Sequence, residues 1–155
     1  MKNLNIGLDN SVKEKVSDIL KHILADTYVL YYKTQVSHWN IEDPRFHSLH
    51  EMFEEQYEQL QDATDEIAER MRTLGAKAPL GLQTLLEATK LKEYEKDLDA
   101  NNMIKSLLED HEHLIIELRQ GIKTCADLGD DGNADFLTAR LEEHEKTAWM
   151  LRSSL

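Results

Sequence analysis

The sequence predicts an all-α protein, a bundle of four long helices with one long crossover connection. Three observations favour this fold class. The chain has 155 residues, enough for one domain with a proper hydrophobic core. Charged residues make up 31% of it, and only two prolines and six glycines interrupt it. Apolar residues recur in four long segments at the spacing of a helix that buries one face.

The first helix is expected from about Asn10 to His38, after a short flexible tail at residues 1–9. We therefore expect residues 10–155 to form the folded domain. Apolar residues recur along this helix and predict its core-facing side: Val12, Val16, Ile19, Ile23 and Leu30. Three tyrosines lie near its end, and we interpret them as packing residues rather than redox-active groups: Tyr28, Tyr31 and Tyr32.

The second helix is expected after Asp43 and Pro44, which suit an N-cap and a first helical turn. It should reach Leu74, because Gly75 suits the position just past a helix end. The apolar positions of this helix form one stripe: Leu49, Phe53, Leu60, Ile67 and Met71. That stripe predicts the side that faces the core.

Residues 76–99 form a long connection, in which Pro79 and Gly81 interrupt regular structure and residues 82–88 suit a short helix. A bundle whose second and third helices run parallel needs such a crossover. The third helix is expected at about residues 100–127. Its inward side chains are predicted to be Ile104, Leu107, Leu108, Ile115, Leu118 and Ile122.

The fourth helix is expected to follow a turn at residues 129–133 and to end near Arg152. Its inward residues are predicted to be Leu137, Leu141, Ala148 and Leu151. His111 and His144 lie on the apolar stripes of the last two helices. A metal site inside the bundle would need inward carboxylates from several helices, and we therefore interpret both as core or interface histidines.

The second helix also carries a polar stripe. At about 100° per residue, Glu54 lies about 40°, Asp65 about 60° and Glu69 about 100° from His50. This stripe is about 130° away from the core face by the same arithmetic. One imidazole and three carboxylates suit a divalent metal ion such as iron.

The spacing along the helix adds a second constraint. His50 and Glu54 are one turn apart, as are Asp65 and Glu69, so each pair can share a metal ion. About 16 Å of helical rise separates the two pairs, whereas metal–ligand bonds are about 2 Å long. An antiparallel copy of the helix across a two-fold axis would bring one pair against the other. His38 could reach the His50 end, so the spacing predicts a metal site shared between subunits.

Several motifs resemble the Dps family of mini-ferritins: His38-Trp39-Asn40, His50-Glu51-Met52, the Asp65 and Glu69 pair, Leu74-Gly75 and the segment 134–139. The resemblance covers almost the whole chain. The spacing of five candidate ligands matches the family's ferroxidase signature: His38, His50, Glu54, Asp65 and Glu69. The family usually has Asp at the position of Glu54, a departure that bears on occupancy or rate at that subsite.

The resemblance implies a ferritin-like bundle and a ferroxidase that oxidises Fe(II), preferably with hydrogen peroxide, at a di-iron site between subunits. The ferric product would be stored as a mineral in a hollow dodecamer, which protects the cell and its DNA from oxidative damage. One subunit would supply His38, His50 and Glu54, and its two-fold partner would supply Asp65 and Glu69.

The resemblance also gives roles to residues outside the ligand set. It implies that Trp39 donates electrons during peroxide reduction; the structural alternative is a cap on the end of the first helix. It implies that acids near the last turn line three-fold pores for iron entry, and we favour Asp131 and Asp135, which share one helical face. The ordinary alternative is that acids favour a helix N-terminus through its dipole.

Composition excludes several functional classes. The chain has no 18-residue apolar run and no apolar N-terminal signal segment, so we expect neither membrane insertion nor export. The single cysteine, Cys125, excludes an internal disulfide and fits the reducing cytoplasm. We interpret it as a small packing side chain rather than a reactive thiol. The formal net charge of −12 suits metal cations far better than nucleic acid.

Two other functions compete with this interpretation. The first is a DNA-binding, nucleoid-compacting protein with iron storage secondary. Residues 1–15 hold three lysines against two acids and form no polybasic arm, so we expect no direct DNA binding except through magnesium or at low pH. The second is a helical scaffold without chemistry. The matched five-residue ligand set, placed away from the core face, argues against it.

Overall fold

The computed structural model describes residues 4–155, and all regular secondary structure in that range is helical. Four long helices and one short helix are present: α1 (Asn10–Asn40), α2 (Phe46–Thr73), α3 (Leu82–Ala88), α4 (Ala100–Asp127) and α5 (Asp131–Arg152). The predicted fold class, a ferritin-like four-helix bundle with a long crossover, is confirmed. None of the helices in the described range is both long and apolar enough to cross a bilayer.

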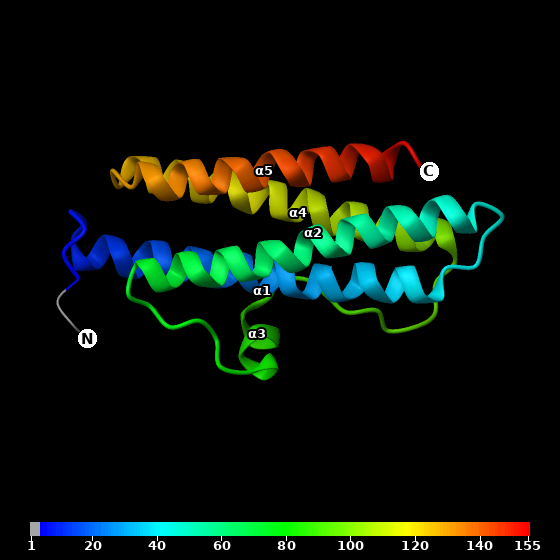
Figure 1. Ribbon diagram of the computed structural model, residues 1–155, viewed down its shortest axis with the longest axis horizontal. Coiled ribbons are helices and arrows are strands. Elements are labelled where there is room, and N and C mark those ends of the chain that lie inside the picture. The colour runs from blue at the N-terminus through cyan, green and yellow to red at the C-terminus, as the bar shows by residue number, and fades with distance from the viewer. Residues whose placement is uncertain (1–3) are drawn as a thin grey trace.

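The long helices form two antiparallel pairs, α1 with α2 and α4 with α5 (Figure 1). The chain leaves α2 at one end of the bundle and enters α4 at the other, so α2 and α4 run in the same direction. The crossover spans that length and carries α3, which lies outside the bundle against α1.

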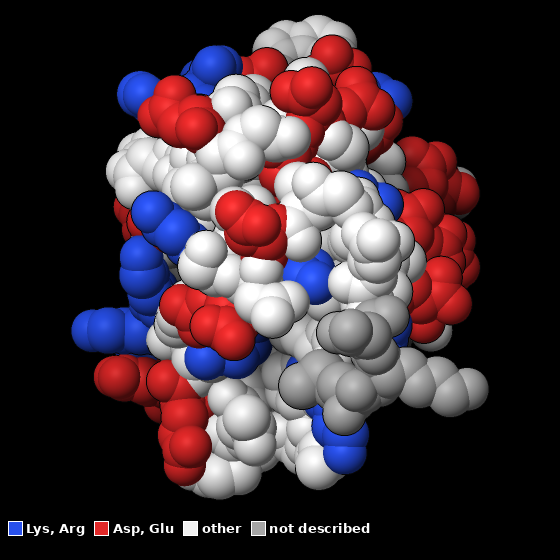
Figure 2. All heavy atoms as spheres, turned by 90° about the vertical axis from the view of Figure 1, so that its left-hand side faces the viewer, with Lys and Arg blue, Asp and Glu red and all other residues white. Residues whose placement is uncertain are grey.

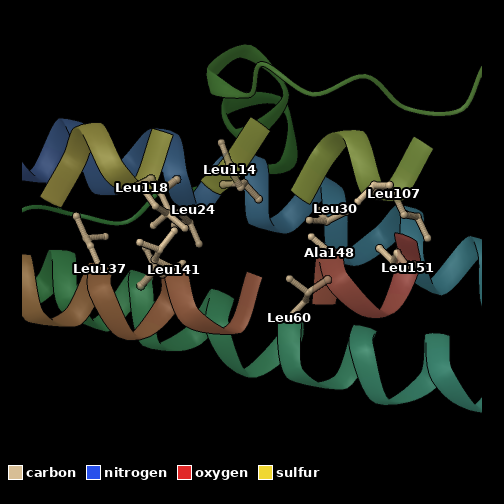
Figure 3. Packing of buried hydrophobic residues seen from close by; sticks show 14 of the residues in the cluster. Leu24, Leu30, Leu60, Leu107, Leu114, Leu118, Leu137, Leu141, Ala148 and Leu151 are labelled. Carbon is tan, nitrogen blue, oxygen red and sulfur yellow. The ribbon is translucent and has the colours of Figure 1, made fainter. Parts of the chain in front are cut away.

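The hydrophobic core fills the space between the two pairs (Figure 3). In α2 the whole predicted stripe is buried: Leu49, Phe53, Leu60, Ile67 and Met71. In α5 all four predicted inward residues are buried: Leu137, Leu141, Ala148 and Leu151. These positions recur every three or four residues, so one face of each helix contributes continuously to the core.

The start of α2 differs from the prediction. The helix begins at Phe46, and Asp43 does not cap it. Instead, the Asp43 carboxylate accepts hydrogen bonds from the backbone N and the side-chain Nε of Arg45, both at 2.8 Å. Asp43 and Pro44, which were predicted to begin the helix, therefore belong to a turn that precedes it.

A glycine and an aspartate mark the end of α2 and the start of α5. Gly75 has φ of +86° just past α2, as expected at a helix C′ position. Asp130 caps α5 by accepting from the backbone N of Asn133 at 3.1 Å. Helix α5 therefore begins at Asp131, inside the predicted turn at residues 129–133.

Buried polar contacts fasten the crossover to α1. The Asp26 carboxylate, 2% exposed, accepts hydrogen bonds from Thr89 Oγ1 and the backbone N of Lys90, both at 2.7 Å. The predicted tail at residues 1–9 lies partly outside the described range, which begins at Leu4. The Leu4 carbonyl oxygen accepts a hydrogen bond from Lys13 Nζ at 2.9 Å.

Candidate metal centre

Two histidines lie face to face where α1 ends and α2 begins. His38 is in the last turn of α1 and is 8% exposed, whereas His50 is in the second turn of α2 and is half-buried. The centroids of their rings are 3.7 Å apart, and the ring planes are inclined by 18°. The short connection between the helices thus brings two of the five predicted ligands together.

Each of these rings also bonds to the backbone of the other residue. Nδ1 of His38 lies 2.9 Å from the carbonyl oxygen of His50, and Nδ1 of His50 lies 2.9 Å from the carbonyl oxygen of His38. A carbonyl oxygen only accepts, so each Nδ1 must donate and must carry a proton. In the neutral rings Nε2 then keeps its lone pair, which is the form of imidazole that binds a metal ion.

Aromatic rings cover both sides of the histidine pair. Phe46 stacks on His50 with centroids 4.9 Å apart, and Tyr57 meets His38 edge to face at 5.2 Å. Tyr57 is seven residues after His50, hence about 20° from it around the helix. Helical spacing could therefore have identified Tyr57, although an aromatic residue at this spacing usually indicates packing.

Glu54 lies one turn after His50 on the same side of α2 and is half-buried. Its carboxylate is close enough to influence Tyr57. Partial burial raises the pKa of the Tyr57 phenol, and the charges of Glu54 and Glu58 raise it further. Glu54 thus lies on the side of α2 that carries His50, although His38, His50 and Glu54 do not lie close enough together in this chain to hold a metal ion.

The second predicted pair lies elsewhere on the helix. Asp65 and Glu69 are exposed, in the C-terminal half of α2. Since α2 is one continuous helix, Asp65 remains about 16 Å of helical rise away from Glu54, and Glu69 lies one turn further away. Within residues 4–155, no three His, Cys, Asp or Glu side chains lie close enough together to hold a metal ion. The chain thus offers two partial ligand sets.

The end of α2 that carries Asp65 and Glu69 is fixed to the turn between α4 and α5. Arg70 Nε donates to Asn133 Oδ1 at 2.8 Å, and Asn133 Nδ2 donates to Asp130 Oδ2 at 2.6 Å. A Cβ atom at Gly132 would lie 2.8 Å from Arg70 Nη2, so a larger residue there would require the end of the Arg70 side chain to shift. The sequence analysis did not identify this connection, because a turn residue gives no indication of its distant partner.

The two predicted pore acids lie at the same end of the bundle. Asp131 is in the first turn of α5 and Asp135 is one turn later, and both are exposed. Figure 2 shows this end, with acidic side chains gathered over its upper part and right-hand edge. The arrangement matches an acidic surface beside the second ligand pair, and the pore itself stays a prediction.

Trp39 points away from the histidine pair. Its side chain is 59% exposed, and its ring meets Tyr32 at a centroid distance of 6.4 Å. Among the aromatic rings of the described chain, those of Phe46 and Tyr57 contact the two histidines. The electron-donor role of Trp39 stays a prediction.

A second histidine pair lies in the core between α4 and α5. His111 and His144 are each 2% exposed, and their Nδ1 atoms are 2.9 Å apart. Burial lowers the pKa of His111 to about 3, and the nearby positive charge of Arg140 acts in the same direction. The interpretation of these residues as core histidines is confirmed by their burial, and within residues 4–155 they belong to no group of three His, Cys, Asp or Glu side chains.

Comparisons with known proteins agree with this geometry. Residues 17–155 match the family described as the ferritin-like domain. A low temperature-induced protein of Nostoc sp. (strain PCC 7120) is 45% identical over 99% of this chain and 87% of its own length. DNA protection during starvation protein 2 of Bacillus anthracis is 33% identical over 93% of this chain and 99% of its own.

Solved structures give the same result. The crystal structure of the DPS protein from Vibrio cholerae O1 superposes with a TM-score of 0.92 at 33% identity and covers 99% of this chain and 96% of that one. It is described as a member of a broad superfamily of ferritin-like diiron-carboxylate proteins. A Dps protein from Bacillus brevis gives a TM-score of 0.90 at 32% identity, over 94% of this chain and 98% of that one.

Proposed function

The chain belongs to the Dps family of ferritin-like proteins, whose general role is iron storage and DNA protection, and from this premise we propose that it is a ferroxidase. In this proposal the protein oxidises Fe(II) with hydrogen peroxide and stores the ferric product as a mineral inside a hollow dodecamer. The observation that carries the proposal is the pair of reciprocal hydrogen bonds between His38 and His50. These bonds leave Nε2 of both rings free to bind the substrate Fe(II).

The ligand chemistry suits iron as the substrate. Imidazole nitrogen and carboxylate oxygen hold Fe(II) while leaving positions open for an oxidant. The carboxylates of Glu54, Asp65 and Glu69 are negative, and their attraction is stronger for Fe(III) than for Fe(II). The site therefore favours the oxidised product, which makes the transfer of electrons to peroxide more favourable.

The site is completed in this proposal by a two-fold partner. Asp65 and Glu69 are exposed and distant from the histidines of their own chain, so an antiparallel copy would supply the second half of each site. Large apolar side chains on the crossover are also uncovered in the single chain. Leu80 is 90% exposed and Leu82 is 63% exposed, which favours burial against further copies.

The redox balance needs two electrons for each peroxide. Two Fe(II) ions lose one electron each, the O–O bond breaks, and two protons are taken up to give two water molecules. No hydroxyl radical is released when both electrons arrive together. Iron storage and peroxide removal are thus one reaction, and DNA is protected indirectly.

The decisive test is anaerobic stopped-flow absorbance of Fe(II) oxidation by peroxide. We compare the wild type with Asp65→Asn/Glu69→Gln and with His38→Ala/His50→Ala. Loss of a residue that only orients a metal ligand typically lowers activity ~10- to 100-fold. We expect the rate of iron oxidation to fall by at least that factor in each variant, because the ligands themselves are removed. Oligomers reassembled from both variants should regain partial activity, because some interfaces then contain one complete site.

A matched control removes two acids elsewhere. Glu109 and Glu142 are exposed on α4 and α5, and the described residues form no ion pair with them. Glu109→Gln/Glu142→Gln should oxidise iron at the wild-type rate. Normal rates in both ligand variants would show that the chemistry lies elsewhere. Activity losses without recovery in the mixed oligomer would contradict the shared site alone.

A further inference from the structure

Three tyrosines continue the line of aromatic rings that begins at the histidine pair. The Tyr57 ring lies 5.2 Å from His38, the Tyr31 ring lies 6.3 Å from Tyr57, and the Tyr28 ring lies 5.8 Å from Tyr31, all measured between centroids. These rings come from both α1 and α2, so the series crosses the helix pair and leads away from the metal centre. All three tyrosines are half-buried.

We propose that Tyr57 donates an electron to the metal centre when only one Fe(II) is bound, and that Tyr31 and Tyr28 carry the resulting radical away from it. The inference rests on the proposed reaction of Fe(II) with peroxide. What it adds is the assignment of the one-electron donation to Tyr57 rather than to Trp39, and a path of two further tyrosines for the radical.

The chemistry explains why such a donor is needed. A centre with one Fe(II) supplies one electron, and peroxide that receives one electron yields hydroxide and a hydroxyl radical. With Tyr57 as second donor, Fe(II) and the phenol each lose one electron and the O–O bond breaks. The two peroxide protons, the phenol proton and one solvent proton then make two water molecules. The products are Fe(III), a neutral tyrosyl radical at Tyr57 and water, so charge and atoms balance.

The surroundings of Tyr57 suit this role. The carboxylates of Glu54 and Glu58 lie near the phenol, and negative charge nearby favours the loss of an electron from a ring. Transfer onward exchanges a phenol for a phenoxyl radical: Tyr31 gives an electron and a proton, and Tyr57 becomes a phenol again. The ring contacts that the sequence analysis attributed to packing thus also provide a path.

The aromatic pair of Trp39 and Tyr32 is less suited to donate the first electron to the metal centre. Trp39 meets Tyr32, and both side chains are exposed, at 59% and 46%. A radical on that pair would be open to solvent, whereas Tyr57 and Tyr31 are partly covered by α1 and α2. The rings in contact with the two histidines are those of Phe46 and Tyr57, and of these two only Tyr57 carries a phenol that can lose an electron and a proton.

The test uses the assembled protein, loaded anaerobically with one Fe(II) for each His38–His50 pair and then mixed with hydrogen peroxide. Freeze-quench electron paramagnetic resonance detects the tyrosyl radical, and a nitrone spin trap in a parallel sample detects hydroxyl radical. The variants are Tyr57→Phe and Tyr31→Phe, which keep the rings and remove only the phenol group. Tyr32→Phe is the matched control, since it changes a tyrosine of α1 outside the series.

We expect a tyrosyl signal in the wild type and in Tyr32→Phe. Tyr57→Phe should lose the signal and release several-fold more trapped hydroxyl radical, and Tyr31→Phe should keep an early radical that fails to migrate. An unchanged signal in Tyr57→Phe would overturn the proposal, as would its loss in Trp39→Phe instead. Failure of the proposed function is separate: the wild type would then oxidise Fe(II) no faster than His38→Ala/His50→Ala.

Discussion

At the scale of single residues, the backbone sets the chemistry of the proposed metal centre. The last four carbonyl groups of a helix lack partners inside it. His38 lies in the last turn of α1, and its carbonyl oxygen accepts from Nδ1 of His50. The carbonyl oxygen of His38 at the end of α1 thus fixes the proton of His50 on Nδ1. The two hydrogen bonds therefore leave Nε2 as the nitrogen of each ring that faces the proposed metal ion.

The buried pair His111 and His144 is kept neutral by its surroundings. Burial lowers the pKa of His111 to about 3. Burial also lowers the pKa of His144 well below its usual value, and the charges of His111 and Arg140 contribute in the same direction. An unfolded histidine takes up a proton as the pH falls below about 6.5. The unfolded state then binds more protons than the folded state, so stability must fall with pH in that range.

We predict that replacing this pair with apolar residues removes part of the acid sensitivity. Each histidine contributes a loss of about 1.4 kcal/mol per pH unit below about pH 6.5. The slope is reached gradually below pH 6.5, so between about pH 6.5 and pH 5 wild type should lose about 3 kcal/mol more stability than His111→Leu/His144→Leu. Guanidinium unfolding followed by circular dichroism at both pH values measures the difference. Equal losses in both proteins would contradict the prediction, because all other histidines are unchanged between them.

The approach of the two histidines could be predicted from the sequence, but the tautomer of their rings and the role of the neighbouring tyrosine could not. His38 and His50 were expected to approach each other, and they do, because helical spacing and a short connection determine their positions. The tautomer could not be predicted, since it depends on where two carbonyl oxygens point. Tyr57 was overlooked although it lies on the same face, because aromatic residues at helical spacing usually indicate packing.

At the scale of elements, a buried ion pair connects α1 with α4 and the crossover. Lys33 is 4% exposed and forms a salt bridge with Asp110. Its ammonium also donates to Ser106 Oγ at 3.2 Å and lies 5.0 Å from the Tyr94 ring centroid. Burial raises the pKa of Asp110, and the hydrogen bond and charge of Lys33 counteract part of that effect. Removing only one partner of this ion pair should therefore destabilise the fold, because the other charge would remain without compensation.

We predict that Lys33→Met lowers the free energy of unfolding by about 3–5 kcal/mol, because Asp110 would be left charged and buried without a partner. Adding Asp110→Leu should restore most of the loss. Lys21→Met is the control: its salt bridge with Asp18 is exposed, so its removal should cost less than about 1 kcal/mol. Denaturant midpoints of the four proteins test this. If Lys33→Met lowered the free energy of unfolding as little as Lys21→Met does, the buried ion pair would not contribute to stability as predicted.

The helices themselves were largely predictable, and their attachments were not. Periodicity placed the third helix at residues 100–127 and the short one at 82–88, as observed. The start of α2 was two residues off, because Asp43 bonds to Arg45 rather than to the helix. The contacts of Asp26 with the crossover join residues more than 60 positions apart. No local pattern encodes such a partner, since a buried aspartate on α1 has the same sequence signal as an exposed one.

At the scale of the whole molecule, charge and exposed apolar surface point to different partners. Leu80, Leu82 and Trp149 are each more than 60% exposed, which favours contact with further protein surface. The formal net charge of −12 repels nucleic acid, and twelve copies would carry twelve times that charge. The exposed apolar surface thus favours assembly with further copies, whereas the net negative charge opposes DNA binding.

We predict that the assembled protein does not shift linear DNA in a gel at physiological salt. Binding to DNA requires cationic side chains that displace counterions from phosphates, and its strength falls steeply with salt. This chain offers no cluster of that kind in its first 15 residues, where three lysines face two acids. Magnesium or a pH near the isoelectric point of about 4.9 should permit weak binding, because each reduces the repulsion.

A gain-of-function variant makes the same prediction testable in the other direction. A short polylysine extension at the N-terminus should create a gel shift that disappears as salt is raised, while iron oxidation at the distant metal centre continues. If the extended protein binds and the unmodified protein does not, the missing basic arm explains the difference. Tight binding by the unmodified protein at physiological salt would instead reveal a cationic surface that the total charge conceals, and direct compaction of DNA would then replace indirect protection through iron oxidation.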